Sequence, residues 1–123
     1  MKKDNFTKLY ELALDKYEDM EKMFSENEIK AINNGKCWVV YALDRLFSGW
    51  GKSNKKNNHI FVICWSHEQE FNIKNSLENA HEMSYVSSCS VDYFVSKKDR
   101  HGTWSIKNAN DCAAWNKGLE VKI

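Results

Sequence analysis

The chain contains no proline and only five glycines among its 123 residues. It has no inter-domain linker, internal repeat or low-complexity tract, which indicates a single domain over residues 1–123. No apolar run approaches the length needed to span a bilayer, so we expect no membrane-embedded segment. The opening Met1-Lys2-Lys3-Asp4 leads into a polar segment and not into the apolar stretch of a signal peptide. We therefore expect a cytoplasmic protein.

Cysteine is sparse and widely spaced, at Cys37, Cys64, Cys89 and Cys112. In an intracellular protein this pattern predicts reduced thiols and no disulfide. Cys64 and His67 have the short spacing of half a zinc site, but the chain offers no second half. We therefore predict that the protein holds no metal and no cofactor.

Strong charge of either sign is also lacking, since the formal net charge is +1. A chain so close to neutrality is not expected to bind polyanions over its whole surface or to steer them from a distance. A charged binding surface would have to be local.

Two short apolar runs, residues 37–43 and 60–65, lie at the centre of the chain. Both are rich in β-branched and aromatic side chains, which suit strands. Both faces of the first run are apolar, which predicts a central strand covered on two sides and paired antiparallel with the second. The alternative is a buried helix over residues 37–47, because periodicity alone does not separate the two structures.

The first 35 residues predict a helical hairpin. Apolar side chains recur at steps of three and four over residues 5–24, as on one face of an amphipathic helix. Ser25 and Glu28 form a capping-box pattern that predicts a second, short helix after Ser25. Gly35 is the expected stop of that helix.

The remaining chain predicts one more long helix and further strands. Ser66 and Gln69 have capping-box spacing, so a helix is expected over 67–80. Residues 85–91 read as a strand, 93–96 as its continuation or a fourth strand, 99–102 as a turn, and 103–106 as an edge strand. Asn108 to Asp111 predict a last short helix through Asn116, closed by Gly118.

The predicted order of elements is ααββαβββα, which defines the fold class as α+β. The N-terminal hairpin, residues 1–35, is expected to pack on a small, mostly antiparallel sheet built by residues 36–123. The strand at 60–65, the helix at 67–80 and the strand at 84–91 form one βαβ crossover.

The segment between the two central runs carries the candidate binding site. Trp50 lies between two glycines, so its backbone can bend, and cationic side chains follow it. An aromatic ring with cations is typical of single-strand nucleic-acid binding and equally of a protein hot spot. A second basic cluster, at residues 97–101, lies at the same end of the sheet only if the chain reverses near Val91. The predicted partner-binding residues are Trp50, Lys52, Lys55, Lys56, His59, Lys97, Lys98, Arg100 and His101.

Catalysis has little support in the sequence. Gly49-Trp50-Gly51-Lys52 is too short for a phosphate-binding loop and does not open a helix. Acidic side chains lie mostly on exposed helix faces, which does not favour paired carboxylates. A Cys–His pair is the one enzymatic alternative that remains open, because such partners need only meet in space. The sequence therefore does not favour an enzyme and names no catalytic residue.

The strand-loop-strand core carries a resemblance. The stretch with Ser48-Gly49-Trp50-Gly51, the strand at 60–64, the following helix, and Tyr93-Phe94-Val95-Ser96 resembles small uncharacterised proteins of bacteriophages and mobile elements. The resemblance covers residues 36–97, and only residues 48–51 are distinctive. It implies no activity. It does imply a context, because small phage-borne accessory proteins often bind and block a host component.

These observations predict a small, non-enzymatic binding protein that acts on an intracellular protein partner. If the protein is phage-encoded, the resemblance implies an inhibitor in the host cytoplasm. The alternatives are a nucleic-acid-binding protein that uses the basic segments 52–59 and 97–101, and an enzyme with a Cys–His pair. The sequence does not specify the oligomeric state or the identity of the partner.

Overall fold

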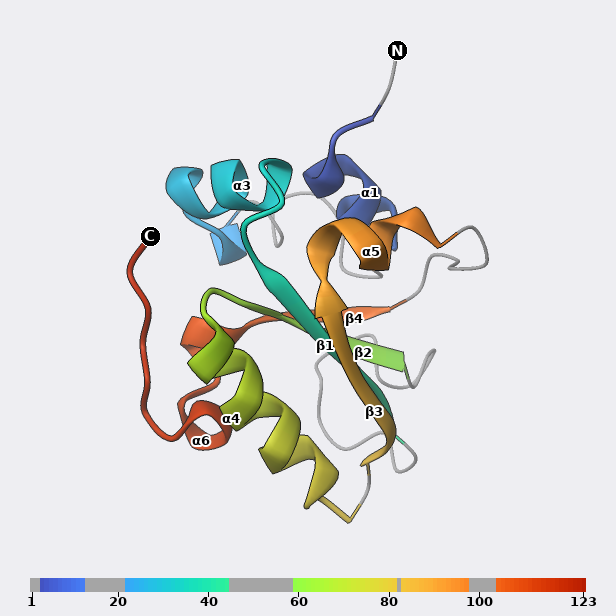
Figure 1. Ribbon diagram of the computed structural model, residues 1–123, viewed down its shortest axis with the longest axis vertical. Helices are drawn as coiled ribbons and strands as arrows, with labels where there is room; N and C mark the ends of the chain where they lie inside the picture. Colours follow the sequence, from blue (N-terminus) through green and yellow to red (C-terminus); the bar gives the residue numbers. More distant parts are fainter. Residues whose placement is uncertain (1–2, 13–21, 45–58, 82, 98–103) are drawn as a thin grey trace.

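The central run of the sequence forms the central strand of a four-stranded mixed sheet (Figure 1). The computed structural model describes residues 3–12, 22–44, 59–81, 83–97 and 104–123. The elements in chain order are α1 (Asn5–Leu12), α3 (Glu26–Asn33), β1 (Trp38–Asp44), β2 (His59–Cys64), α4 (His67–Glu78), β3 (Met83–Ser90), α5 (Val91–Ser96), β4 (Ser105–Asn108), η2 (Ala109–Asp111) and α6 (Ala113–Asn116).

The order of strands in the sheet is β3-β1-β2-β4. β1 pairs antiparallel with β2, with Trp38 opposite Cys64 and Leu43 opposite His59. β1 also pairs antiparallel with β3, whereas β2 and β4 run parallel. The predicted central strand and its partner are therefore confirmed, and the alternative of a helix over 37–47 is wrong. Because β2 and β3 share a direction on either side of β1, the predicted crossover through α4 is present.

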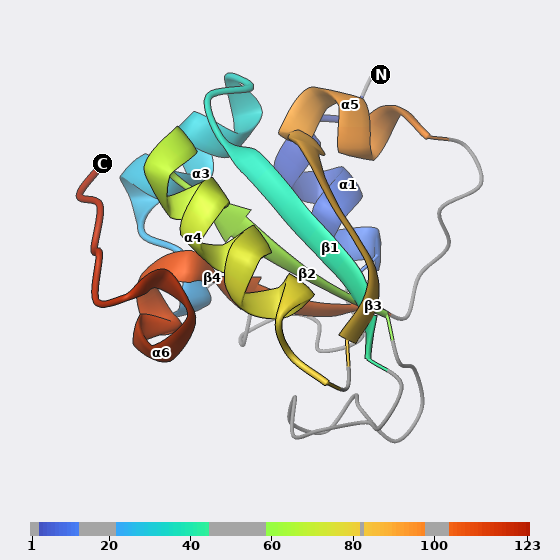
Figure 2. The ribbon, with the colours of Figure 1, turned by 60° about the horizontal axis from the view of Figure 1, so that its bottom comes forward.

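Helices cover both faces of the sheet (Figures 1 and 2). On one face Val39, Phe61 and Ile63 pack in a core with residues of α1, α3 and α5. On the other face Val40 and Val62 pack in a core with residues of α4 and η2. Alternate side chains of β1 thus enter two different cores, which explains why both of its faces are apolar. The α+β class is confirmed.

Local capping chemistry sets the ends of α3. The Ser25 side chain accepts from the Glu28 amide at 3.1 Å, and Glu28 Oε1 accepts from the Ser25 amide at 2.9 Å. At the other end Gly35, with φ +72°, donates to Ile32 O, and Lys36 donates to Ala31 O. These two bonds form a Schellman motif, so the predicted start and stop are both confirmed.

The cap of α4 agrees with the prediction in one half only. The Ser66 hydroxyl accepts from the Gln69 amide at 3.1 Å, as expected of an N-cap. Gln69 Oε1, however, accepts from the backbone amide of Trp65 at 2.8 Å. The Gln69 side chain therefore binds the last residue before the cap, and Gln69 is fully buried.

Residues 93–96 are not a strand, and this part of the predicted order is wrong. They belong to α5, which begins after Ser90, whose side chain accepts from the Tyr93 amide at 3.2 Å. Val91 and Phe94 are fully buried and are spaced three apart, as on one face of a helix. The serine cap and this spacing outweigh the strand propensity of the aromatic and β-branched residues.

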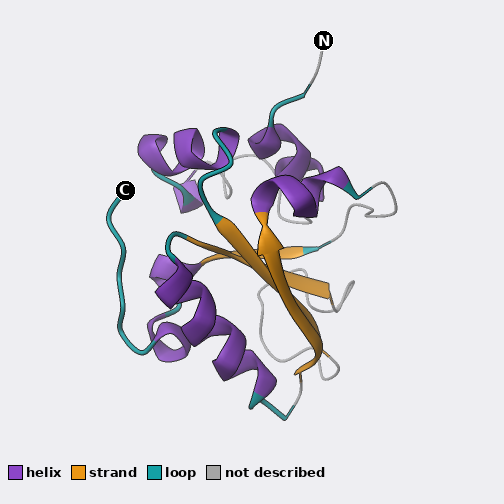
Figure 3. Cartoon of the chain, viewed as in Figure 1, coloured by secondary structure: helices purple, strands orange, loops and turns teal. Residues whose placement is uncertain are grey.

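The other predicted elements are present where the structure describes them. The edge strand is β4, shifted by two residues, and the last helix is divided into η2 and α6, followed by Gly118 with φ +78°. The predicted helix over 5–24 is seen as α1 and as a helical residue pair at 22–23, while 13–21 lie outside the described residues. The predicted turn at 99–102 also lies outside them. Figure 3 shows the strands in one layer with helices on both sides.

Candidate functional site

The two basic segments, 45–58 and 98–103, are connected to strands at the same end of the sheet. β1 ends there, and β2 begins there with His59 opposite Leu43. β4 begins at the same end, because Ser105 pairs with Ile60. The two segments 45–58 and 98–103 therefore join the sheet at one end, which we call the loop end and define by Leu43, His59 and Trp104.

The chain direction at the end of β3 decides this arrangement. β3 runs away from the loop end, because Met83 lies opposite Asp44 and Ser90 lies opposite Trp38. The chain then turns into α5 at Val91 and does not continue as a strand. The chain therefore reverses near Val91, and the alternative of one long strand over residues 84–97, which would place the two basic clusters at opposite ends of the sheet, is wrong.

Beneath the loop end lies a cluster of four aromatic rings, the aromatic floor. It consists of Tyr41, Phe61, Phe94 and Trp104. The Trp104 ring lies 5.6 Å from Phe94, 5.9 Å from Phe61 and 6.3 Å from Tyr41 between centroids. All three are edge-on arrangements of the kind that aromatic pairs prefer. Trp104 is buried, so the floor fixes the point at which the chain re-enters the sheet.

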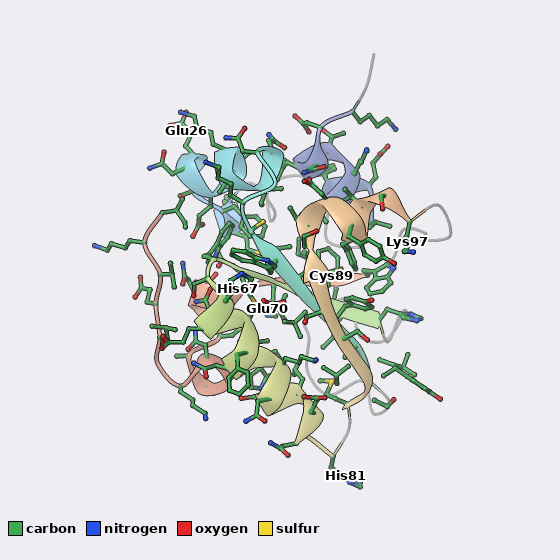
Figure 4. All side chains as sticks on the ribbon, viewed as in Figure 1. Glu26, His67, Glu70, His81, Cys89 and Lys97 are labelled. Atoms are coloured by element: carbon green, nitrogen blue, oxygen red, sulfur yellow. The ribbon has the colours of Figure 1, made fainter. Side chains whose placement is uncertain are left out.

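Two of the predicted site residues are among the described residues, and both contact aromatic rings. The exposed His59 lies with its ring 4.9 Å from the ring of Trp104. Lys97 Nζ lies 4.3 Å from the ring centroid of Tyr93, a cation–π geometry. Figure 4 shows Lys97 beyond the end of α5, on the side of the molecule away from α4.

Lys97 is linked to the loop end through α5. Tyr93, whose ring Lys97 contacts from four residues further along the chain, is half exposed, while the next residue, Phe94, belongs to the aromatic floor. The structure thus brings His59 and Trp104 together and places Lys97 one helical turn from a residue that contacts Trp104. The remaining predicted residues lie outside the described part of the chain: Trp50, Lys52, Lys55, Lys56, Lys98, Arg100 and His101.

The thiols give no support to a Cys–His nucleophile. Burial, and secondarily the negative charge of Asp92, raises the pKa of Cys37 to about 12. Burial raises the pKa of Cys64 still more strongly and that of Cys112 to about 11. A cysteine nucleophile needs a lowered pKa, because the thiolate is the reactive form. All four cysteines lie in the described residues as reduced thiols.

His67, the histidine closest in sequence to Cys64, interacts with other residues. Its Nδ1 lies 3.0 Å from Glu70 Oε1, and its ring centroid lies 4.1 Å from that of Trp38. Cys64 Sγ instead donates to the Val62 carbonyl at 3.8 Å. Figure 4 shows His67 and Glu70 together at the first turns of α4. This histidine is exposed and the thiol is buried, so the two are not arranged as a catalytic pair.

The raised pKa of Cys37 predicts a loss of stability at high pH. Below pH 9.0, the ordinary pKa of a thiol, Cys37 is neutral in both the folded and the unfolded protein, and its contribution to stability is complete. Above that pH only the unfolded thiol ionises, so folding weakens by about 1.4 kcal/mol per pH unit until the folded pKa is reached. Between about pH 9 and about pH 11 the unfolding free energy of Cys37→Ala should therefore fall less steeply with pH than that of the wild type, by about 1.4 kcal/mol per pH unit. Urea unfolding at several pH values measures it, and identical slopes in the two proteins would contradict the assignment.

A buried polar network, which the sequence did not reveal, joins four parts of the chain. Its centre is the Asn108 amide, which is buried at the end of β4. Asn108 Oδ1 accepts from the Trp65 indole at 2.8 Å, and Asn108 Nδ2 donates to Glu28 Oε1 at 3.1 Å and to Met23 O at 2.9 Å. This one side chain therefore ties Glu28 of α3, and Met23 just upstream of that helix, to Trp65 at the end of β2.

The network continues to the C-terminal segment through Asn110. Its Nδ2 donates to Glu28 Oε2 at 3.1 Å and to the Val121 carbonyl at 2.8 Å, and its Oδ1 accepts from the Val121 amide at 2.9 Å. Gln69 Nε2 donates to Asn110 Oδ1 and to Leu119 O. Each polar group thus has a partner, which is what a buried network needs to stabilise a fold. The network lies at the opposite end of β2 from the loop end, and we assign it a structural role.

Comparison with protein families, with curated proteins and with solved structures found no match for this chain. Among the described residues, no group of three or more His, Cys, Asp or Glu is arranged to hold a metal ion. No helix in the described ranges is long and apolar enough to cross a membrane.

Proposed function

We propose that this protein is a non-enzymatic binding protein whose loop end binds an acidic surface on a protein partner. The observation that carries the proposal is that both basic segments attach to the same end of the sheet, above the aromatic floor. Across 45–58 and 98–103 the sequence has cationic side chains with one acid, Asp99, among them. The cations are Arg45, Lys52, Lys55, Lys56, Lys98 and Arg100.

Local charge of this kind has a physical use in a chain that is nearly neutral overall. Lysines around a contact speed the encounter with an acidic partner and disfavour basic ones. Affinity itself comes from a few large side chains at the centre of the contact, most often Trp, Tyr or Arg. Trp50, between Gly49 and Gly51, is the one tryptophan of the two segments, which also contain Arg45 and Arg100. The packed floor formed around Trp104 supports the proposal, because binding residues need a fixed base.

The proposed setting follows from the resemblance to small bacteriophage and mobile-element proteins. In that setting the protein acts stoichiometrically in the cytoplasm of a host cell and blocks the host component that it binds. The raised pKa values of three of the cysteines give no support to the alternative of an enzyme with a Cys–His pair.

Single-stranded nucleic acid is the second candidate partner. The observation that favours it is the contact of polar side chains with aromatic rings in the described residues, at His59 with Trp104 and at the Lys97 cation over Tyr93. Aromatic platforms beside phosphate-binding cations are the usual means of binding single strands. Salt separates the two candidates, because affinity for phosphates falls steeply with salt concentration.

The test is capture of the partner from host extract, with and without nuclease, followed by mass spectrometry. Two variants of the full chain accompany the wild type. One replaces Lys52, Lys55 and Lys56 with glutamine, and the matched control replaces the exposed lysines Lys30, Lys36 and Lys122. We expect a nuclease-resistant protein partner that the first variant loses and the control retains. Equal capture by all three proteins would contradict the proposed surface, and capture lost to nuclease would favour the second candidate.

A further inference from the structure

We infer that the outer edge of β3 pairs antiparallel with the same edge of a second copy, which joins two sheets into one. β3 is an edge strand of eight residues, Met83–Ser90, and within the described ranges β1 is the only strand paired with it. Figures 1 and 3 show β3 along one margin of the sheet, with α5 continuing from one end. The outward backbone groups of such a strand form a template for another strand.

The two edges of the sheet differ in their protection. β4, at the other edge, has four residues and carries Lys107, and the Trp104 amide donates to the Leu12 carbonyl of α1 at 2.7 Å. Short length, charge and a covering element are the usual means of blocking an edge. β3 has the sequence Met-Ser-Tyr-Val-Ser-Ser-Cys-Ser, which is long and contains neither a charged residue nor proline.

β3 contains one irregularity, and it exposes an aromatic ring. The register shifts between Tyr41 and Leu43, so that Tyr85 and Val86 together lie opposite Ala42 in a β-bulge. Tyr85 has φ +54° and is 83% exposed. A left-handed backbone costs a residue with a side chain about 1–2 kcal/mol. The fold therefore bears strain at a ring that contributes little to its own core.

The second copy is the occupant that fits these features best. In an antiparallel pair about a two-fold axis, the start of one β3 lies against the end of the other. Tyr85 at the start would then approach Tyr93 just past the end, which is 51% exposed, and the contact would occur twice. Because β3 has no charge, pairing with itself places no like charges opposite one another. The regular part, Ser87 to Ser90, is free of the bulge and supplies the ladder.

Sedimentation equilibrium of the full chain across the micromolar range tests this inference. We expect a monomer–dimer equilibrium, with slowed hydrogen exchange at the amides of residues 87–90 as concentration rises. Ser88→Lys puts a charged side chain on the pairing edge of each copy, a usual means of blocking edge pairing, and should weaken the dimer at least about tenfold. The exposed control Thr7→Lys should leave it unchanged.

If Ser88→Lys fails to fold, Tyr85→Gly tests the dimer instead. Glycine adopts a positive φ without strain, so the monomer should unfold at the same or a higher temperature while the dimer weakens at least about tenfold. A monomer at every concentration would overturn the inference. A dimer that Tyr85→Gly and a folded Ser88→Lys both leave intact would place the contact elsewhere and overturn it as well.

Discussion

Replacing Asn108 with alanine should lower the free energy of unfolding by about 3–5 kcal/mol, because the buried Trp65 indole is left without an acceptor and two further groups each lose a hydrogen bond at once. The Trp65 indole N–H loses its acceptor, and the Met23 carbonyl and the Glu28 carboxylate each lose a donor. An unsatisfied buried group costs more than an average hydrogen bond contributes, and one next to a charge costs more still. The alanine also removes the cap of η2, since Asn108 Oδ1 accepts from the Asn110 amide.

Urea unfolding of Asn108→Ala beside Asn27→Ala measures the effect. Asn27 is the matched control, because its exposed amide makes a single bond, to the Ile123 carbonyl at 3.2 Å. Its loss should cost under about 1 kcal/mol. If Asn108→Ala costs no more than the control, the network does not stabilise the fold as we describe.

The parts of the fold that the sequence predicted depend on local signals. β1 was predictable because both of its faces are apolar, and β2 because its run is short and β-branched. The ends of α3 follow from Ser25, Glu28 and Gly35, whose roles are fixed within a few residues of chain. Each of these signals is local, because it depends only on residues within or next to the segment itself.

The parts that the sequence did not predict depend on contacts between distant segments. α5 has strand-like composition, and its helix is fixed by the Ser90 cap together with the burial of Phe94 against Trp104. The buried network depends on Asn108 and Asn110 meeting Glu28, about eighty residues away in the chain. Asparagine after a strand indicates a cap or a turn, and nothing local distinguishes one that will be buried.

The candidate site was predictable in composition but not in arrangement. The aromatic and cationic residues could be read directly, yet their meeting at one end depended on whether residues 93–96 extended β3 or turned back as a helix. The aromatic floor was also hidden, since Tyr41, Phe61, Phe94 and Trp104 come from four separate elements or their flanks.

Trp50→Ala should weaken binding to the partner by about 2 kcal/mol or more while leaving the unfolding free energy nearly unchanged. A tryptophan between two glycines lies on backbone that can bend toward a partner, and its ring offers a large apolar area. Trp104→Ala is the matched control, because this buried ring contacts Phe61 and Phe94 and its loss should cost about 3–5 kcal/mol of stability. Thermal melts of the two variants separate a surface tryptophan from a core one, and a large fall in melting temperature for Trp50→Ala would contradict its place in the site.

The most direct test of the loop end as the binding surface is a calorimetric titration of the captured partner with wild-type and Trp50→Ala protein, run at low and at high salt. We expect a loss of affinity of about thirtyfold in the variant, the equivalent of about 2 kcal/mol, together with a fall in wild-type affinity with salt that is less steep than phosphate contacts would give. Equal affinities for the two folded proteins would contradict the assignment of the loop end as the surface that binds the partner.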